Sequence, residues 1–109
     1  MTLNEYQILA QRTSNTQNAS KLTNGLLGLF GEGGELADLL KKYRYQGHDF
    51  PIEHAVKELG DVLWYVAEIA TGLGVTLKEV AEKNIEKLKE RYPDGFSADK
   101  SINRKEGDV

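Results

Sequence analysis

The sequence contains no cysteine among its 109 residues. Disulfide bonds and metal sites with thiolate ligands are therefore excluded, and nothing marks an oxidising compartment, so we expect a cytoplasmic protein. No stretch approaches the roughly 18 consecutive apolar residues of a membrane-spanning helix, and the first residues lack the basic region and apolar run of a signal peptide. We expect a soluble protein with no membrane partner.

An excess of positive charge is also absent. The formal net charge is −3, with acidic and basic residues interleaved along the chain. Binding to the backbone of DNA or RNA requires a basic stripe or patch, so we expect no polymeric nucleic acid as a partner. The hydrophobic share of 39% suffices for one modest core in a chain of this length, which predicts a single domain.

Proline is scarce, with only Pro51 and Pro93. The apolar residues between them follow helical spacing rather than the alternation of strands, which predicts an all-α fold. The expected helices are a short one at about 2–12 and three longer ones at about 20–45, 52–73 and 76–91. They should form a four-helix bundle, in which the short connection around 46–51 makes the second and third helices an antiparallel hairpin. Residues 1–97 would form the domain, and 98–109 a polar, disordered tail.

The sequence contains two acidic pairs whose members are three positions apart: Glu32 with Glu35, and Glu58 with Asp61. Residues at this spacing are neighbours on a helix surface, and both pairs flank the apolar stripe of their helix in the same rotational sense. When two antiparallel helices face each other stripe to stripe, features displaced in the same sense lie on the same side of the interface. The sequence therefore predicts a cluster of four carboxylates.

Four carboxylates at the edge of a core repel one another and need a counter-charge. Oxygen ligands, without His or Cys at the matching helix positions, favour Mg²⁺, with Mn²⁺ as a substitute, over Zn²⁺ or a di-iron centre. Mg²⁺ held by carboxylates usually serves a phosphate ester or anhydride. The alternative is that the acids are solvated surface charges, but the matched arrangement of two pairs favours a metal site.

The fourth predicted helix carries Asn84 inside its apolar stripe, with Lys87 and Arg91 along the adjoining edge. These side chains can face the acidic site and contact the phosphate oxygens or sugar of a substrate. Alternatively, Asn84 is a buried bridging amide and the two bases extend along the surface.

Two further residues lie on the acidic side of their helices. Tyr65, one turn beyond the second acidic pair, can either hydrogen-bond a ligand or pack in the core. Lys42 can reach a phosphate or form a salt bridge with Asp38 or Glu68.

Two apolar features predict contacts with a neighbouring helix or chain. Trp64 points away from the main stripe of its helix, which favours a contact with another copy of the chain. Gly33 lies inside the stripe of the preceding helix, where the missing side chain would let another helix approach.

The segments GEGGELADLLKKY and KELGDVLWYVAEIATGLGVTLKEVAEKNIEKLKERYPDGFS resemble the MazG-type all-α nucleoside triphosphate pyrophosphohydrolases, specifically their short single-domain members. The resemblance covers about residues 26–97. It implies a helical bundle completed by oligomerisation into a homodimer or homotetramer. It also implies that the chain hydrolyses an NTP or dNTP to the monophosphate and pyrophosphate, as nucleotide-pool housekeeping. The residues that it places at the site are the metal ligands Glu32, Glu35, Glu58 and Asp61, and Asn84, Lys87 and Arg91 near the nucleotide.

The implied reaction is attack of water on a phosphorus of the triphosphate, with Mg²⁺ neutralising the oxygens and the leaving pyrophosphate. One carboxylate, Glu35 or Glu58, is expected to orient or deprotonate the water. Two alternatives stay open. The chain can be a base-specific relative that acts on dCTP, dUTP or phosphoribosyl-ATP, or a non-catalytic helical interaction module in which Trp64 and the apolar stripes serve assembly.

Overall fold

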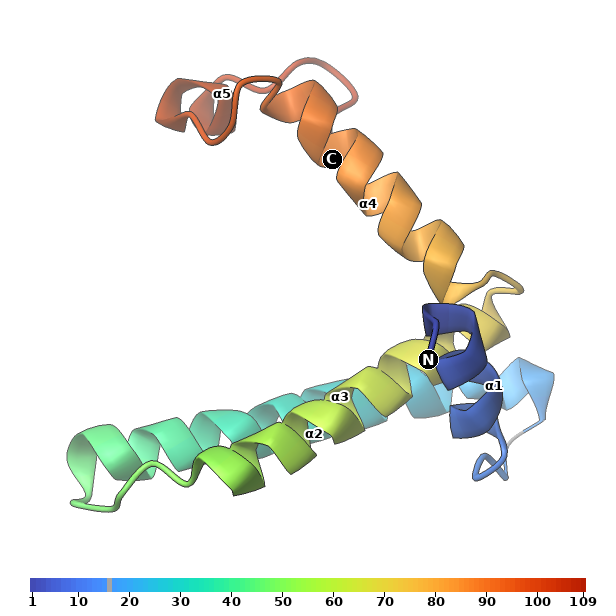
Figure 1. Ribbon diagram of the computed structural model, residues 1–109, viewed down its shortest axis with the longest axis vertical. Helices are drawn as coiled ribbons and strands as arrows, with labels where there is room; N and C mark the ends of the chain where they lie inside the picture. Colours follow the sequence, from blue (N-terminus) through green and yellow to red (C-terminus); the bar gives the residue numbers. More distant parts are fainter. Residues whose placement is uncertain (16) are drawn as a thin grey trace. The chain divides into compact units, whose positions relative to one another are not determined.

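The computed structural model describes residues 1–15 and 17–109, and every regular element in these ranges is a helix (Figure 1). The helices are α1 (Leu3–Gln11), α2 (Asn18–Tyr45), α3 (Ile52–Gly72), α4 (Leu77–Arg91) and α5 (Ala98–Ile102). The predicted all-α class is confirmed. The ends of α1 to α4 lie within two residues of the predicted ends, the largest difference being the start of α2 at Asn18 instead of residue 20. None of the described helices has the length and apolarity needed to cross a membrane.

The chain divides into two compact units, Met1–Leu77 and Lys78–Val109. The first contains α1, α2 and α3, and the second contains nearly all of α4, together with α5. The domain boundary expected at residue 97 and the expected disorder of 98–109 stay predictions. Within that stretch the structure has the short helix α5, whose N-cap Ser97 accepts a hydrogen bond from the Lys100 backbone N–H.

Helices α2 and α3 form the predicted antiparallel hairpin and pack side by side (Figure 1). The chain reverses between Tyr45 and Ile52, where Gly47 has a positive φ of 74°. Glycine reaches this conformation without the steric penalty that a side chain would add. The short reversal holds the two helices in contact, so residues on their facing edges can form one site.

Glycines allow the hairpin helices to approach closely at one part of their length. A Cβ atom on Gly25 would overlap the side chain of Ile69, and one on Gly28 would overlap the ring of Tyr65. The close approach predicted at Gly33 is not found, because a Cβ atom there would meet none of the described atoms within 4 Å. Glycine therefore serves helix packing nearer the start of α2 than the sequence predicts.

Helix α1 is attached to the end of α3 by polar contacts of Gln7. Its amide nitrogen donates to the Thr71 hydroxyl at 3.1 Å and to the Val75 carbonyl oxygen at 3.0 Å. Its amide oxygen accepts the backbone N–H of Leu77 at 2.7 Å. One side chain thus joins the Thr71 hydroxyl, before the turn that follows α3, to backbone groups of Val75 and Leu77 after it.

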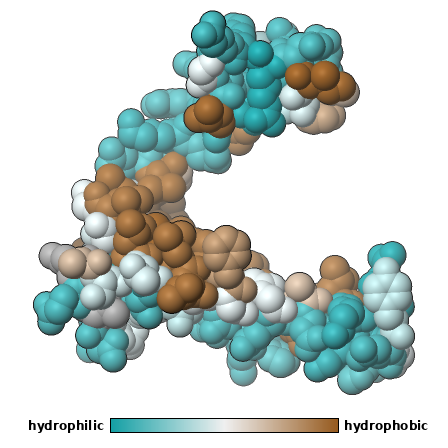
Figure 2. All heavy atoms as spheres, turned by 180° about the vertical axis from the view of Figure 1, so that it is seen from behind, coloured by the Kyte–Doolittle hydropathy of each residue, from teal (hydrophilic) through white to brown (hydrophobic). Residues whose placement is uncertain are grey.

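Trp64 packs on α1 of its own chain, and its contact with another copy of the chain stays a prediction. Its indole N–H donates to the Ala10 carbonyl oxygen and to the Thr13 hydroxyl, both at 2.9 Å. It borders the small core of the unit, whose buried apolar members are Ala10, Ala67, Ala70 and Leu77. Many of the larger apolar side chains are exposed, among them Leu27 and Phe30. Figure 2 shows apolar atoms gathered at the surface of the molecule.

Glu68 of α3 is fully buried, with 0% of its surface exposed. The Ser14 hydroxyl donates to it at 2.7 Å, the Asn24 amide at 2.8 Å, and the Lys21 ammonium lies at 3.3 Å. Burial would raise the pKa of Glu68, but these donors hold it below its usual value. The network ties the segment after α1 and the start of α2 to α3. It also pairs Glu68 with Lys21, in place of the alternative partner Lys42.

Candidate metal centre

Three of the four predicted metal ligands meet on the α2–α3 hairpin. One carboxylate oxygen from each of Glu32, Glu58 and Asp61 lies within 4.8 Å of the other two. Glu35 lies beside them, since its carboxylate affects the protonation of both Glu32 and Glu58. Acidic residues from two helices thus converge on one side of the hairpin, in the arrangement that the antiparallel geometry favours.

The crowding of acids separates their proton affinities. Burial, together with the neighbouring carboxylates of Glu58, Glu35 and Asp61, raises the pKa of Glu32 to about 7. The interaction with Glu35 and a hydrogen bond with His54 hold the pKa of Glu58 below its usual value. At neutral pH Glu32 is therefore protonated in a fraction of the molecules. A bound divalent cation would displace this proton.

Two oxygens of the cluster indicate that it fits a cation. Glu32 Oε2 and Glu58 Oε2 are buried, and neither has a hydrogen-bond partner among the described residues. A buried carboxylate oxygen without a partner costs free energy. A hard divalent cation would satisfy both atoms, and a donor set made only of oxygen suits Mg²⁺ or Mn²⁺. The residues present therefore fit the predicted ion.

A pocket of about 430 Å³ lies beside the acids. Its lining residues are Gly31, Gly34, Glu35, Asp38, Leu39, Lys42, His54 and Glu58. Gly31 and Gly34 leave the helix backbone bare there, because a Cβ atom on either would meet no described atom within 4 Å. The pocket has room for part of a ligand that also touches the acids.

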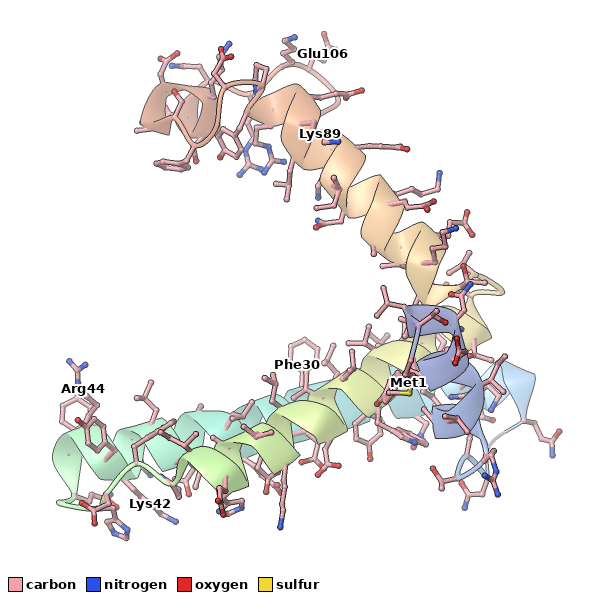
Figure 3. The ribbon with its side chains drawn as sticks, in the orientation of Figure 1. Met1, Phe30, Lys42, Arg44, Lys89 and Glu106 are labelled. Atoms are coloured by element: carbon pink, nitrogen blue, oxygen red, sulfur yellow. The ribbon has the colours of Figure 1, made fainter. Side chains whose placement is uncertain are left out.

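Lys42 lies in the half of the hairpin that contains the reversal (Figure 3). Its ammonium nitrogen is 2.9 Å from Asp38 Oδ2, which is one of the two salt bridges considered from the sequence. A contact between Lys42 and a phosphate stays a prediction. The exposed pair with Asp38 contributes little to stability, so its exchange for a phosphate oxygen would cost little.

Tyr65 takes the packing role that was one of its two alternatives. Its ring covers Gly28 and meets the Trp64 ring edge to face, with centroids 5.0 Å apart. A hydrogen bond from Tyr65 to a ligand stays a prediction.

The sequence reasoning missed two residues near the cluster, His54 and Tyr6. His54 Nε2 lies 2.9 Å from Glu58 Oε1, and the four-residue spacing on one helix could have revealed this pair. Burial and the charge of Asp61 raise the pKa of Tyr6, which places this α1 side chain near the acids. No sequence signal joins α1 to Asp61, because their approach depends on tertiary packing.

The remaining predicted substrate residues belong to the second unit. Asn84 and Lys87 are exposed on α4, so Asn84 is not a buried bridging amide there. At the end of α4, the Arg91 guanidinium donates twice to the Asp108 carboxylate, at 2.8 and 2.7 Å. This pairing holds the pKa of Asp108 below its usual range. Contacts of Asn84, Lys87 and Arg91 with a nucleotide stay a prediction.

Comparison with known proteins identifies a family for this chain. The family described as the MazG nucleotide pyrophosphohydrolase domain matches residues 20–96, a range that contains all four predicted metal ligands. The "Gene 37 protein" of Mycobacterium phage L5 is 34% identical over an alignment 110 positions long, which covers 91% of this chain and 96% of that protein. No solved structure matches. The resemblance inferred from the sequence is confirmed, and the chain belongs to the MazG nucleotide pyrophosphohydrolase domain family.

Proposed function

We propose that this protein is a Mg²⁺-dependent pyrophosphohydrolase that converts an NTP or dNTP to the monophosphate and pyrophosphate. The observation that carries the proposal is the meeting of Glu32, Glu58 and Asp61, with two buried oxygens that lack partners, in a chain of this family. Mg²⁺, or Mn²⁺ in its place, would neutralise the phosphate oxygens on which charge develops. Removal of surplus or damaged nucleotides from the cytoplasmic pool is the role that this reaction suits.

The acidic side chains would have two roles: some would bind the ion, and one would accept a proton from water. Glu32, Glu58 and Asp61 would supply carboxylate oxygens to the ion. Glu35 is exposed and lies beside them, so it can take a proton from an attacking water. Glu58 is less suited to that second role, because one of its oxygens already faces His54.

The substrate would lie along the side of the hairpin that carries the acids. Phosphate oxygens would bind at the acids and extend into the pocket with the bare backbone of Gly31 and Gly34, where Lys42 supplies a cation. Further cationic and amide contacts would come from Asn84, Lys87 and Arg91, and Tyr65 would border the site. A base-specific relative, acting on dCTP, dUTP or phosphoribosyl-ATP, would use the same acids and differ only in the base pocket.

Assembly is part of this proposal, as a homodimer or homotetramer. The supporting observation is the apolar surface of α2, where Leu27 is 72% and Phe30 is 77% exposed. Phe30 projects away from the hairpin (Figure 3). A non-catalytic interaction module is less well supported, since Trp64 is occupied by α1.

The test is a product-resolved assay with a panel of NTPs and dNTPs. With Mg²⁺ we expect release of pyrophosphate rather than orthophosphate. Glu58→Gln should lower kcat at least about 100-fold, because it removes a carboxylate ligand of the ion that would neutralise the phosphate oxygens. Glu53→Gln, which changes an exposed acid five residues earlier in α3, is the matched control and should keep wild-type activity. Absence of turnover with both Mg²⁺ and Mn²⁺, or an unchanged rate in Glu58→Gln, would refute the proposal.

A further inference from the structure

His54 lies in the first turn of α3, four residues before Glu58 and therefore on the same helix face. Its Nε2 atom is 2.9 Å from Glu58 Oε1. The side chain of His54 is 55% exposed, whereas that of Glu58 is 15% exposed. The contact thus stands at the edge of the acidic cluster, between solvent and the more buried carboxylates.

The two oxygens of Glu58 have different surroundings. Oε1 faces the imidazole of His54, while Oε2 is buried and has no hydrogen-bond partner among the described residues. The terminal torsion of a glutamate side chain is broad, so an unattached carboxylate samples many orientations. A donor that holds one oxygen also fixes the direction of the other.

We propose that His54 is a positioning residue for the metal centre: its Nε2–H donates to Glu58 Oε1 and keeps Oε2 turned into the cluster. The inference rests on the metal site of the proposed function. An ionised carboxylate can only accept hydrogen bonds, so the imidazole must carry its proton on Nε2 in this contact. Hydrogen bonds that orient ligating side chains typically change metal affinity by about 10–100-fold when they are removed.

The pair of variants His54→Ala and His54→Gln separates positioning from other roles. Alanine removes the donor, whereas the amide nitrogen of glutamine can still donate to Glu58. Since His54 is more than half exposed, neither variant should alter the fold, and far-UV circular dichroism with thermal unfolding checks this.

The experiment is isothermal titration calorimetry of the full chain with Mn²⁺. We expect His54→Ala to bind Mn²⁺ at least about 10-fold more weakly than the wild type. His54→Gln should lie closer to the wild type than to His54→Ala, and the control Glu53→Gln should match the wild type.

Two results would overturn the inference: wild-type Mn²⁺ affinity in His54→Ala, or equal weakening in His54→Ala and His54→Gln. Pyrophosphate release by the wild-type chain is measured in parallel and tests the proposed function separately. A wild type that binds Mn²⁺ through a His54-dependent site but hydrolyses no nucleotide would refute the function and leave the inference standing. Normal hydrolysis with Mn²⁺ binding that is indifferent to His54 would refute the inference alone.

Discussion

At the scale of single residues, Glu68 is a buried charge that the fold tolerates because its neighbours donate to it. Ser14, Asn24 and Lys21 all approach its carboxylate, which holds its pKa below the usual value. A carboxyl group with a lower pKa in the folded than in the unfolded chain stabilises the fold above its unfolded pKa. That contribution is lost as the pH falls through the folded-state pKa.

Glu68→Gln should therefore destabilise the protein in a pH-dependent way. At neutral pH the change leaves Lys21 buried without its counter-charge, and the expected loss in free energy of unfolding is about 3 kcal/mol. As the pH falls below 4.5, the usual pKa of glutamate, the wild type begins to lose the same contribution and the difference should shrink. Urea denaturation at several pH values measures this, with Glu53→Gln as the control. A difference that stays constant from neutral to acidic pH would contradict the assignment.

Residue-scale features of the site were only partly predictable. The four acids could be found because a three-residue spacing on each helix and one antiparallel pairing suffice to bring them together. The contact of His54 with Glu58 was also predictable, since the two residues are four positions apart on α3. Tyr6 was not, because it reaches the neighbourhood of Asp61 only after α1 packs on α3.

At the scale of helices, periodicity predicts which side of a helix faces its neighbour but not how far one helix slides along the other. The bounds of α2 and α3 and their antiparallel pairing follow from spacing and from the short connection. The axial match between the helices does not, which is why close contact occurs at Gly25 and Gly28 instead of Gly33. Helical periodicity likewise indicates the direction in which Trp64 leaves α3, but not that α1 packs on it.

Substituting individual glycines of α2 tests this packing. Gly28→Ala should lower the free energy of unfolding by about 2 kcal/mol, because the new methyl group overlaps the Tyr65 ring and displaces it. Gly31→Ala meets only open space and should raise stability by up to about 1 kcal/mol, the gain in helix propensity. Urea denaturation at one fixed protein concentration compares the two variants. Equal effects at both positions would contradict the close approach at Gly28.

At the scale of the whole molecule, the balance of buried and exposed apolar surface bears on assembly. The buried apolar side chains of the described core are three alanines and Leu77, whereas Leu27 and Phe30 remain largely exposed. Exposed apolar side chains of this size on adjacent turns of one helix are typical of a surface that another protein covers. A second copy of the chain is the simplest partner, because a two-fold interface needs only one self-complementary patch.

Replacing Leu27 and Phe30 together should therefore dissociate the proposed homo-oligomer. We expect the wild type to sediment as a dimer or tetramer and Leu27→Glu/Phe30→Glu as a smaller species, because burying two charges in an interface costs several kcal/mol. Leu27→Met/Phe30→Leu keeps the surface apolar and should keep the wild-type mass. Sedimentation velocity over a range of concentrations measures all three. A monomeric wild type, or an unchanged mass in the charged variant, would show that α2 does not form the interface. Nucleotide hydrolysis by a dissociated variant that stays folded would then show whether one chain suffices for the reaction.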